Sequence, residues 1–66
     1  MILADHLSLV IPTAYVTICN FDFEVLDQGF AAGFLDDPSP LLPCPVVYTE
    51  DDLFVLSLDY ERYVNG

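Results

Sequence analysis

Basic residues are almost missing from this chain. It contains one Arg and no Lys against eleven Asp and Glu, which gives a formal net charge of -10 over 66 residues. Binding to nucleic-acid phosphates depends on Lys and Arg, so the composition argues against nucleic acid as a direct ligand. Anionic membrane surfaces would repel the chain, and no segment has a basic amphipathic face to offset this. Two possibilities remain for its binding partner: a basic protein, or no partner at all.

Targeting and membrane-spanning signals are also lacking. Asp5 stands where a secretory signal would carry Lys or Arg. The longest stretch without a formal charge, residues 6–21, contains Pro12 and falls short of the roughly 18 apolar residues that span a bilayer. We therefore expect neither a signal peptide nor a transmembrane helix.

Cysteine is scarce as well. Cys19 and Cys44 are too far apart for a CxxC motif and could form at most one disulfide. Without an export signal, free buried thiols and a location in the cytoplasm are the favoured interpretation.

The groups that usually perform catalysis are few and poorly placed. His6 is the single histidine and lies close to one end of the chain, and no Lys, Arg or second His lies near either cysteine to lower its pKa. Gly29 and Gly33 do not belong to a phosphate-binding loop pattern. The acidic runs lack EF-hand spacing, and consecutive acidic side chains point in different directions. We therefore expect that the protein is not an enzyme and that it has neither a cofactor nor a specific metal site.

What the chain does contain is a large apolar fraction. Hydrophobic residues make up 55% of it, including five Phe and four Tyr, which is far too many for an acidic disordered protein. A chain of this length buries only about 60% of its unfolded surface and has room for one core. We predict a single compact domain over residues 1–66 of the α+β class, with a small antiparallel sheet of three to four strands and one short helix.

A proline-rich segment at residues 36–45 is the clearest boundary in the sequence. Four of the five prolines lie within it, and proline removes amide donors and fixes φ. We predict a stiff extended connector that is neither helix nor central strand. The portions on either side, about 35 and about 20 residues long, are each too small to fold alone, so they must pack on each other.

The N-terminal portion combines one helix-like and one strand-like pattern. Residues 3–10 fit a short helix whose inward side chains would be Leu3, Leu7 and Val10. Residues 13–26 are rich in β-branched and aromatic residues, and apolar and acidic residues alternate over residues 21–25, which predicts a half-buried strand. The region of Asn20 is expected to kink or turn this strand.

The sequence that follows is ambiguous. Residues 27–29 indicate a tight turn into residues 30–35, although Phe30 and Phe34 also suit one face of a helix. Strand or loop is favoured, because each Gly in a helix interior costs about 1 kcal/mol relative to Ala.

The C-terminal portion predicts a hairpin with an acidic tip. Residues 46–49 and 53–60 would be its strands, on either side of residues 50–52. A helix is the alternative, since Thr49 and Asp52 resemble a capping box and helical spacing follows in Leu53, Leu56, Tyr60 and Tyr63. The strand is favoured because a helix would leave Phe54, Val55 and Leu58 on the opposite arc.

The acidic residues recur in several groups among the residues expected to form the core, so folding would hold them in fixed places. If residues 21–25 form a strand, Asp22 and Glu24 lie on one face about 7 Å apart, and Asp59 and Glu61 would do the same if the last strand continues. Such rows would imitate a phosphate backbone. The candidate partner-binding residues are Asp22, Glu24, Asp36, Asp37, Glu50, Asp51, Asp52, Asp59 and Glu61.

In its size, acidity and lack of catalytic motifs, the chain resembles the small phage-encoded anti-CRISPR proteins that imitate DNA. The likeness covers the whole chain as composition, without a diagnostic motif. It implies a compact monomer in the host cytoplasm that occupies the basic groove where a CRISPR effector complex takes up DNA.

Two functional hypotheses follow. In the first, an acidic inhibitor occupies the basic nucleic-acid-binding groove of a host protein or complex, with anchors chosen from Tyr48, Tyr60 and Tyr63, at least one of which we expect in the core. In the second, the chain is a small acidic structural or assembly subunit of a phage or host complex.

Overall fold

The computed structural model describes residues 1–36 and 39–64. Along the chain these residues form α1 (Leu3–Leu9), β1 (Tyr15–Cys19), β2 (Val25–Phe30), α2 (Ala31–Asp36), β3 (Val46–Glu50), β4 (Leu53–Leu56) and α3 (Glu61–Val64). The predicted α+β class and the four-stranded sheet are confirmed. Where one short helix was predicted, the described residues contain three.

The sheet has the strand order β2-β1-β4-β3. The outer pairs, β1 with β2 and β3 with β4, are antiparallel hairpins, and the two central strands β1 and β4 run parallel. The predicted antiparallel pairing is confirmed for the two outer pairs, whereas the central pair is parallel. The chain passes through β2, α2 and the proline-rich segment before it enters β4, and such a long connection permits a parallel partner. The two portions of the chain do pack on each other, as predicted.

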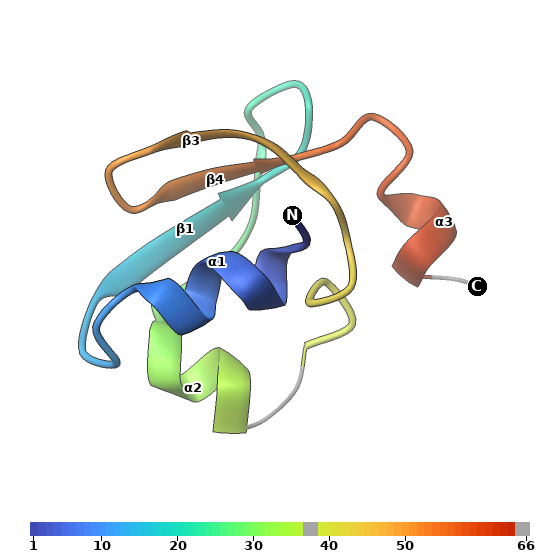
Figure 1. Ribbon diagram of the computed structural model, residues 1–66. Helices are drawn as coiled ribbons and strands as arrows, with labels where there is room; N and C mark the ends of the chain where they lie inside the picture. The colour runs from blue at the N-terminus through green and yellow to red at the C-terminus, as the bar shows by residue number, and fades with distance from the viewer. Residues whose placement is uncertain (37–38, 65–66) are drawn as a thin grey trace.

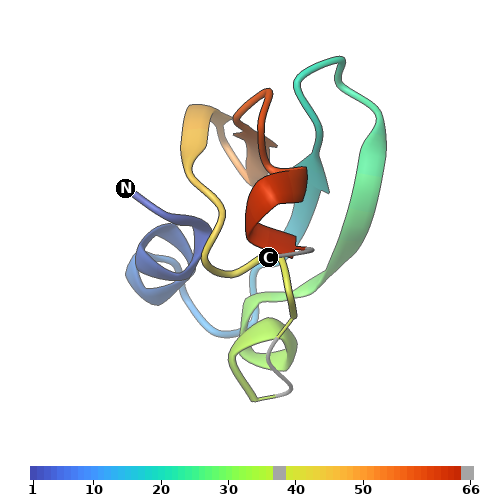
Figure 2. The ribbon, with the colours of Figure 1, turned by 90° about the vertical axis from the view of Figure 1, so that its right-hand side faces the viewer.

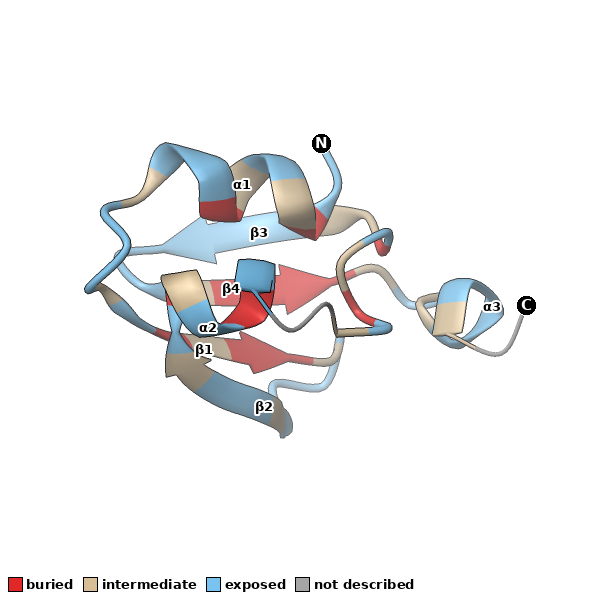
Figure 3. Cartoon of the chain, turned by 90° about the horizontal axis from the view of Figure 1, so that it is seen from below, coloured by how far each residue is buried: buried red, intermediate tan, exposed pale blue. Residues whose placement is uncertain are grey.

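The core lies between one face of the sheet and the helices α1 and α2, which Figures 1 and 3 show on the same side of the sheet. The sheet contributes alternate residues of its two central strands, as the period of a strand requires. The most buried members of this core are Leu3, Leu7, Val16, Ile18, Ala31, Phe34, Phe54 and Leu56.

Helix α1 matches its prediction, with Leu3 and Leu7 buried and Val10 packed against the core. The Asp5 carboxylate accepts a hydrogen bond from the Ile2 amide at 3.4 Å, which helps satisfy the free N–H groups of the first turn.

The described part of the proline-rich segment after α2, residues 39–45, is not an extended connector. In its described C-terminal part the Leu42 amide donates to the Ser39 carbonyl at 3.1 Å, and the Cys44 amide donates to the Leu41 carbonyl at 3.0 Å. These turns bury Leu41 and Cys44 in the core. The apolar residues between these prolines thus bend residues 39–45 onto the helical layer, and these described residues form neither a helix nor a named strand. Asp36 ends α2 instead of beginning the segment.

The strand predicted at residues 21–25 is wrong, because this stretch is the loop between β1 and β2. The side-chain oxygen of Asn20 accepts hydrogen bonds from the amides of Asp22 and Glu24, both at 2.9 Å. Phe23 has a φ of 66°, a left-handed conformation that costs about 1 kcal/mol for a residue with a side chain. The Asn20 side chain therefore competes successfully with strand formation. A turn near Asn20 was predicted and is present.

The turn predicted at residues 27–29 is also wrong, because these residues lie in β2. Gly29 pairs with Val16 of β1, and the ring of Phe34 packs 3.6 Å from the position that a Gly29 Cβ would occupy. The next segment is the helix α2, which buries Ala31 and Phe34. The sequence favours a strand or loop at residues 30–35, and this prediction is wrong. The helix forms because the burial of Phe34 outweighs the helix penalty of Gly33.

The hairpin with an acidic tip is confirmed, but its second strand is shorter than predicted. Strand β4 ends at Leu56, and the Tyr60 amide donates to the Ser57 carbonyl at 3.1 Å in the turn that leads to α3. The Ser57 hydroxyl donates to the Asp59 carboxylate at 2.7 Å. This local bond favours a turn over continued strand. The predicted row of Asp59 and Glu61 on a strand is therefore wrong.

We expect Asn20→Ala to destabilise the fold by about 1 kcal/mol, because two loop amides lose their acceptor. Urea unfolding followed by circular dichroism measures this change. Asn20→Asp is the matched control, since it keeps the acceptor oxygen and should retain most of the stability. Equal loss in both variants would contradict a role for the oxygen.

Candidate protein-interaction surface

The predicted partner-binding residues that the structure describes are all exposed: Asp22, Glu24, Asp36, Glu50, Asp51, Asp52, Asp59 and Glu61. Asp37 lies outside the described residues. Asp5 and Asp27 are exposed as well, so no carboxylate of the described part of the chain lies in the core.

The fold separates these acids into groups instead of a single row. Residues 50–52 form the tip of the β3–β4 hairpin, at the end of the sheet where β4 begins. Asp22 and Glu24 follow β1, which runs parallel to β4, so their loop lies at the opposite end (Figure 1). Asp59 and Glu61 also follow the far end of β4, and Asp36 ends α2. The predicted 7 Å row of Asp22 and Glu24 on a strand is therefore wrong.

The hairpin tip is the densest group of acids. Asp51 has a left-handed φ of 51°, which Asp tolerates better than most residues. Glu50 turns back along its strand and accepts a hydrogen bond from the Tyr48 hydroxyl at 3.0 Å. The hydrogen bond to Glu50, together with the charge of that carboxylate, raises the pKa of Tyr48 above its ordinary value.

This contact predicts a change at alkaline pH. The raised pKa means that the folded state holds the Tyr48 proton more tightly than the unfolded state. The resulting stability is therefore complete below the ordinary tyrosine pKa of about 10 and is lost as pH rises through the folded value. Phenolate absorbance should show one tyrosine titrating late in the native protein. In Glu50→Gln that tyrosine should ionise at lower pH, and an unchanged titration would contradict the bond.

The chain's one Lys or Arg side chain, Arg62, lies on α3. The Arg62 guanidinium of α3 lies 3.7 Å from the Asp59 carboxylate, an exposed ion pair with little effect on stability. The sole histidine, His6, lies on α1 with its ring 5.7 Å from that of Phe54, on the core side of the sheet. The four strands therefore contain no basic side chain.

The face of the sheet turned away from α1 and α2 is covered by no helix in the described part of the chain (Figure 1). Strand alternation and the pairing registers assign its residues. We call this surface the outer face, and its members are Tyr15, Thr17, Cys19, Val25, Gln28, Phe30, Tyr48, Glu50, Leu53 and Val55, with Phe23 reaching it from the adjacent loop.

Two aromatic contacts lie on the outer face, one toward each end. The rings of Tyr15 and Phe30, which are cross-strand partners, meet edge to face at 5.4 Å. Near the other end, the ring of Phe23 meets that of Tyr48 edge to face at 6.3 Å. Phe23 and Phe30 remain 59% and 58% exposed. All four aromatic side chains of the outer face are thus exposed to solvent.

Beneath the second contact lies a small buried cluster that is separate from the main core. Cys19 and Val55 are cross-strand partners, each 2% exposed, with Val25 and Tyr48 as their outer neighbours in the register. Burial raises the pKa of the Cys19 thiol, and also that of Cys44 on the other side of the sheet. Both thiols are free, as predicted, and a raised pKa makes them poor nucleophiles.

Of the predicted anchors, Tyr48 lies on the outer face, while Tyr60 packs against the core as expected for one of the three. Tyr63 is exposed on α3, away from the strands. The sequence interpretation missed Tyr15, Phe23 and Phe30. For Tyr15 the available signal was its alternation with Val16 and Ile18.

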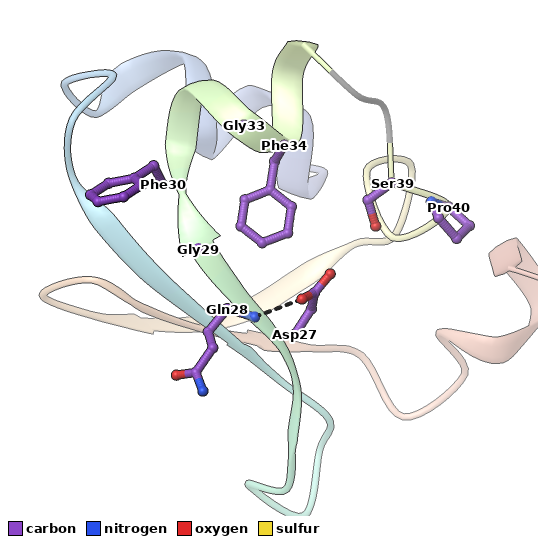
Figure 4. Close-up of a pocket in the computed structure, with 8 residues that line it drawn as sticks. All are labelled: Asp27, Gln28, Gly29, Phe30, Gly33, Phe34, Ser39 and Pro40. Atoms are coloured by element: carbon purple, nitrogen blue, oxygen red, sulfur yellow. Dashed lines mark hydrogen bonds between the residues drawn. The ribbon is translucent and has the colours of Figure 1, made fainter.

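A hollow of about 370 Å³ lies beside the edge strand β2, between it, α2 and the turn at residues 39–40 (Figure 4). The Phe34 ring forms one wall, and the polar residues of the lining include Asp27 and Ser39. The Asp27 carboxylate accepts a hydrogen bond from the Gln28 amide at 2.8 Å, and the Ser39 hydroxyl accepts one from the Leu41 amide at 3.2 Å. The lining contains no histidine, cysteine or basic residue.

Within residues 1–36 and 39–64, no three His, Cys, Asp or Glu side chains are grouped closely enough to hold a metal ion. None of the helices described is long and apolar enough to cross a membrane. No known protein-family model, curated protein sequence or solved structure matches this chain. Its function therefore has to be argued from its own surface.

Proposed function

We propose that this protein is an acidic inhibitor that binds a basic nucleic-acid-binding host protein in the host cytoplasm and excludes nucleic acid from it. A CRISPR effector complex is the first target to test. The observation that carries the proposal is the exposure of every described carboxylate on a folded domain that has one arginine, already paired with Asp59. Such a surface attracts Lys and Arg at long range and repels competing phosphate.

The mechanism is occupancy. Carboxylates of the hairpin tip would pair with basic side chains that otherwise hold phosphates, and nucleic acid would be displaced by competition. The acids lie at both ends of the sheet, which favours contact with a broad cationic surface over imitation of one phosphate strand.

The proposal is tested with purified CRISPR effector complexes and their target DNA. DNA uptake, followed by mobility shift, should fall when the protein is added first, and the inhibition should weaken steeply as salt is raised. In parallel, capture from host lysate at low salt with stepwise salt elution identifies the partner. A tight complex that is indifferent to salt, or the absence of any basic partner, would refute the proposal.

The aromatic outer face favours one alternative, a small acidic structural or assembly subunit of a phage or host complex, because exposed apolar patches mark association sites. Light scattering distinguishes the two functions. A monomer with salt-sensitive partner binding supports the inhibitor, whereas an obligate oligomer that assembles independently of salt supports the subunit.

A further inference from the structure

We infer that the outer face is the docking surface and that its occupant is an arginine-bearing surface of the basic partner protein. This inference rests on the proposed function and names the part of the molecule that performs it. Figure 1 shows that α1 and α2 leave this face of the sheet uncovered.

The chemistry of the outer face matches arginine. Its two aromatic contacts, Tyr15 with Phe30 and Phe23 with Tyr48, lie toward opposite ends of the strands. Arginine guanidinium groups stack on aromatic rings and form hydrogen bonds with carboxylates at the same time. Glu50 supplies a carboxylate on this same face, beside Tyr48.

Charge complementarity decides between possible occupants. Two copies of this chain, each with a formal net charge of -10, would repel one another across a shared face. Open sheets with exposed aromatic residues also stack nucleic-acid bases in other proteins, but there basic side chains hold the phosphates. The strands here carry none. An arginine-bearing protein surface suits both the aromatic rings of the face and its Glu50 carboxylate.

The backbone at Phe23 supports the assignment. Its left-handed φ of 66° is stabilised by an amide hydrogen bond to the Asn20 carbonyl at 3.0 Å, and it brings the ring to Tyr48. The loop thus holds an aromatic residue at the rim of the outer face in a conformation that glycine would adopt with less strain.

The test is a nuclear magnetic resonance titration of the isotope-labelled protein at low salt with a nine-arginine peptide. A nine-lysine peptide and a single-stranded oligonucleotide serve as comparison ligands. Amide shift changes should concentrate on the outer-face residues of all four strands, including Tyr48 and Glu50 of β3, and the arginine peptide should bind more tightly than the lysine peptide. Phe30→Ser should weaken arginine-peptide binding about fivefold, whereas Leu9→Ser, an exposed apolar residue on α1, should not.

Glu50→Gln provides a second variant that removes one charge without truncating a ring, and it should also weaken binding. Equal affinity for both peptides, with shifts spread over all the acidic groups, would overturn the docking face but leave the proposed function intact. If neither peptide binds, both the docking face and the proposed function are refuted. Binding of the oligonucleotide would show that the outer face takes nucleic acid. A dimer that Phe30→Ser dissociates would show that it takes a second copy of this chain, and either result would overturn the arginine-bearing partner as its occupant.

Discussion

Replacing Ile18 with alanine is expected to destabilise the fold by about 4 kcal/mol, a large share of its total stability. Ile18 is completely buried at the centre of the sheet, between Asp27 on β2 and Phe54 on β4. Truncating a buried isoleucine typically costs about 2–5 kcal/mol, because apolar burial is lost and a cavity remains. A domain of this length is stable by only about 3–10 kcal/mol in total.

Urea unfolding followed by circular dichroism measures this loss. Ile18→Val should cost about 1 kcal/mol, since one methylene is removed. Leu9→Ala, in an exposed side chain of α1, should change stability by less than about 0.5 kcal/mol. A cooperative transition for Ile18→Ala at the wild-type midpoint would contradict the packing described.

Neutralising the hairpin tip is expected to weaken binding to the basic partner about tenfold at low salt. The variant is Asp51→Asn with Asp52→Asn, because Asn retains tolerance for the left-handed φ at residue 51 and keeps the turn intact. Two adjacent carboxylates at an exposed tip are well placed to meet a cationic groove, and their loss removes both attraction and steering.

The matched control is Asp5→Asn with Asp36→Asn, two carboxylates carried by the helices α1 and α2. Both double variants have the same net charge, so a difference between them reports position and not total charge. Affinity is measured by titration calorimetry at low and high salt. If the two variants weaken binding equally, net charge alone drives the interaction and the hairpin tip has no special role.

The sequence predicted the elements whose local patterns agree with their burial. The helix at the N-terminus and the C-terminal hairpin both have apolar residues at the period of their structure, and both were found. The errors fall where a side chain or a distant contact overrides the pattern. Alternation over residues 21–25 indicated a strand, but the Asn20 oxygen binds two of its amides.

The second strand of the sheet was missed for a different reason. Residues 27–29 have turn composition, yet β2 is an edge strand where polar residues and glycine are tolerated, and pairing with β1 determines its structure. The parallel alignment of β1 with β4 also depends on contacts between distant parts of the chain, which no local pattern encodes.

The sequence predicted which acidic residues are exposed in the candidate site, but not how they are arranged in space. The exposure of the described acids follows from their charge, because an unpaired carboxylate in the core is strongly unfavourable. Their separation to the two ends of the sheet follows from the strand order, which could not be derived from spacing. The outer face was missed because no local pattern shows which face of the sheet the helices cover. The placement of both helices on one side leaves Tyr15 and Phe30 exposed.

The pairing of Thr17 with Leu53 at the centre of the sheet has a kinetic consequence. Each hairpin is local and forms quickly, but a two-stranded hairpin alone is marginally stable in water. A stable fold requires the two hairpins to pair through β1 and β4, which are far apart in the sequence. Closing so long a loop costs conformational entropy before the contacts between the hairpins can stabilise it. The docking of one hairpin on the other should therefore set the folding rate.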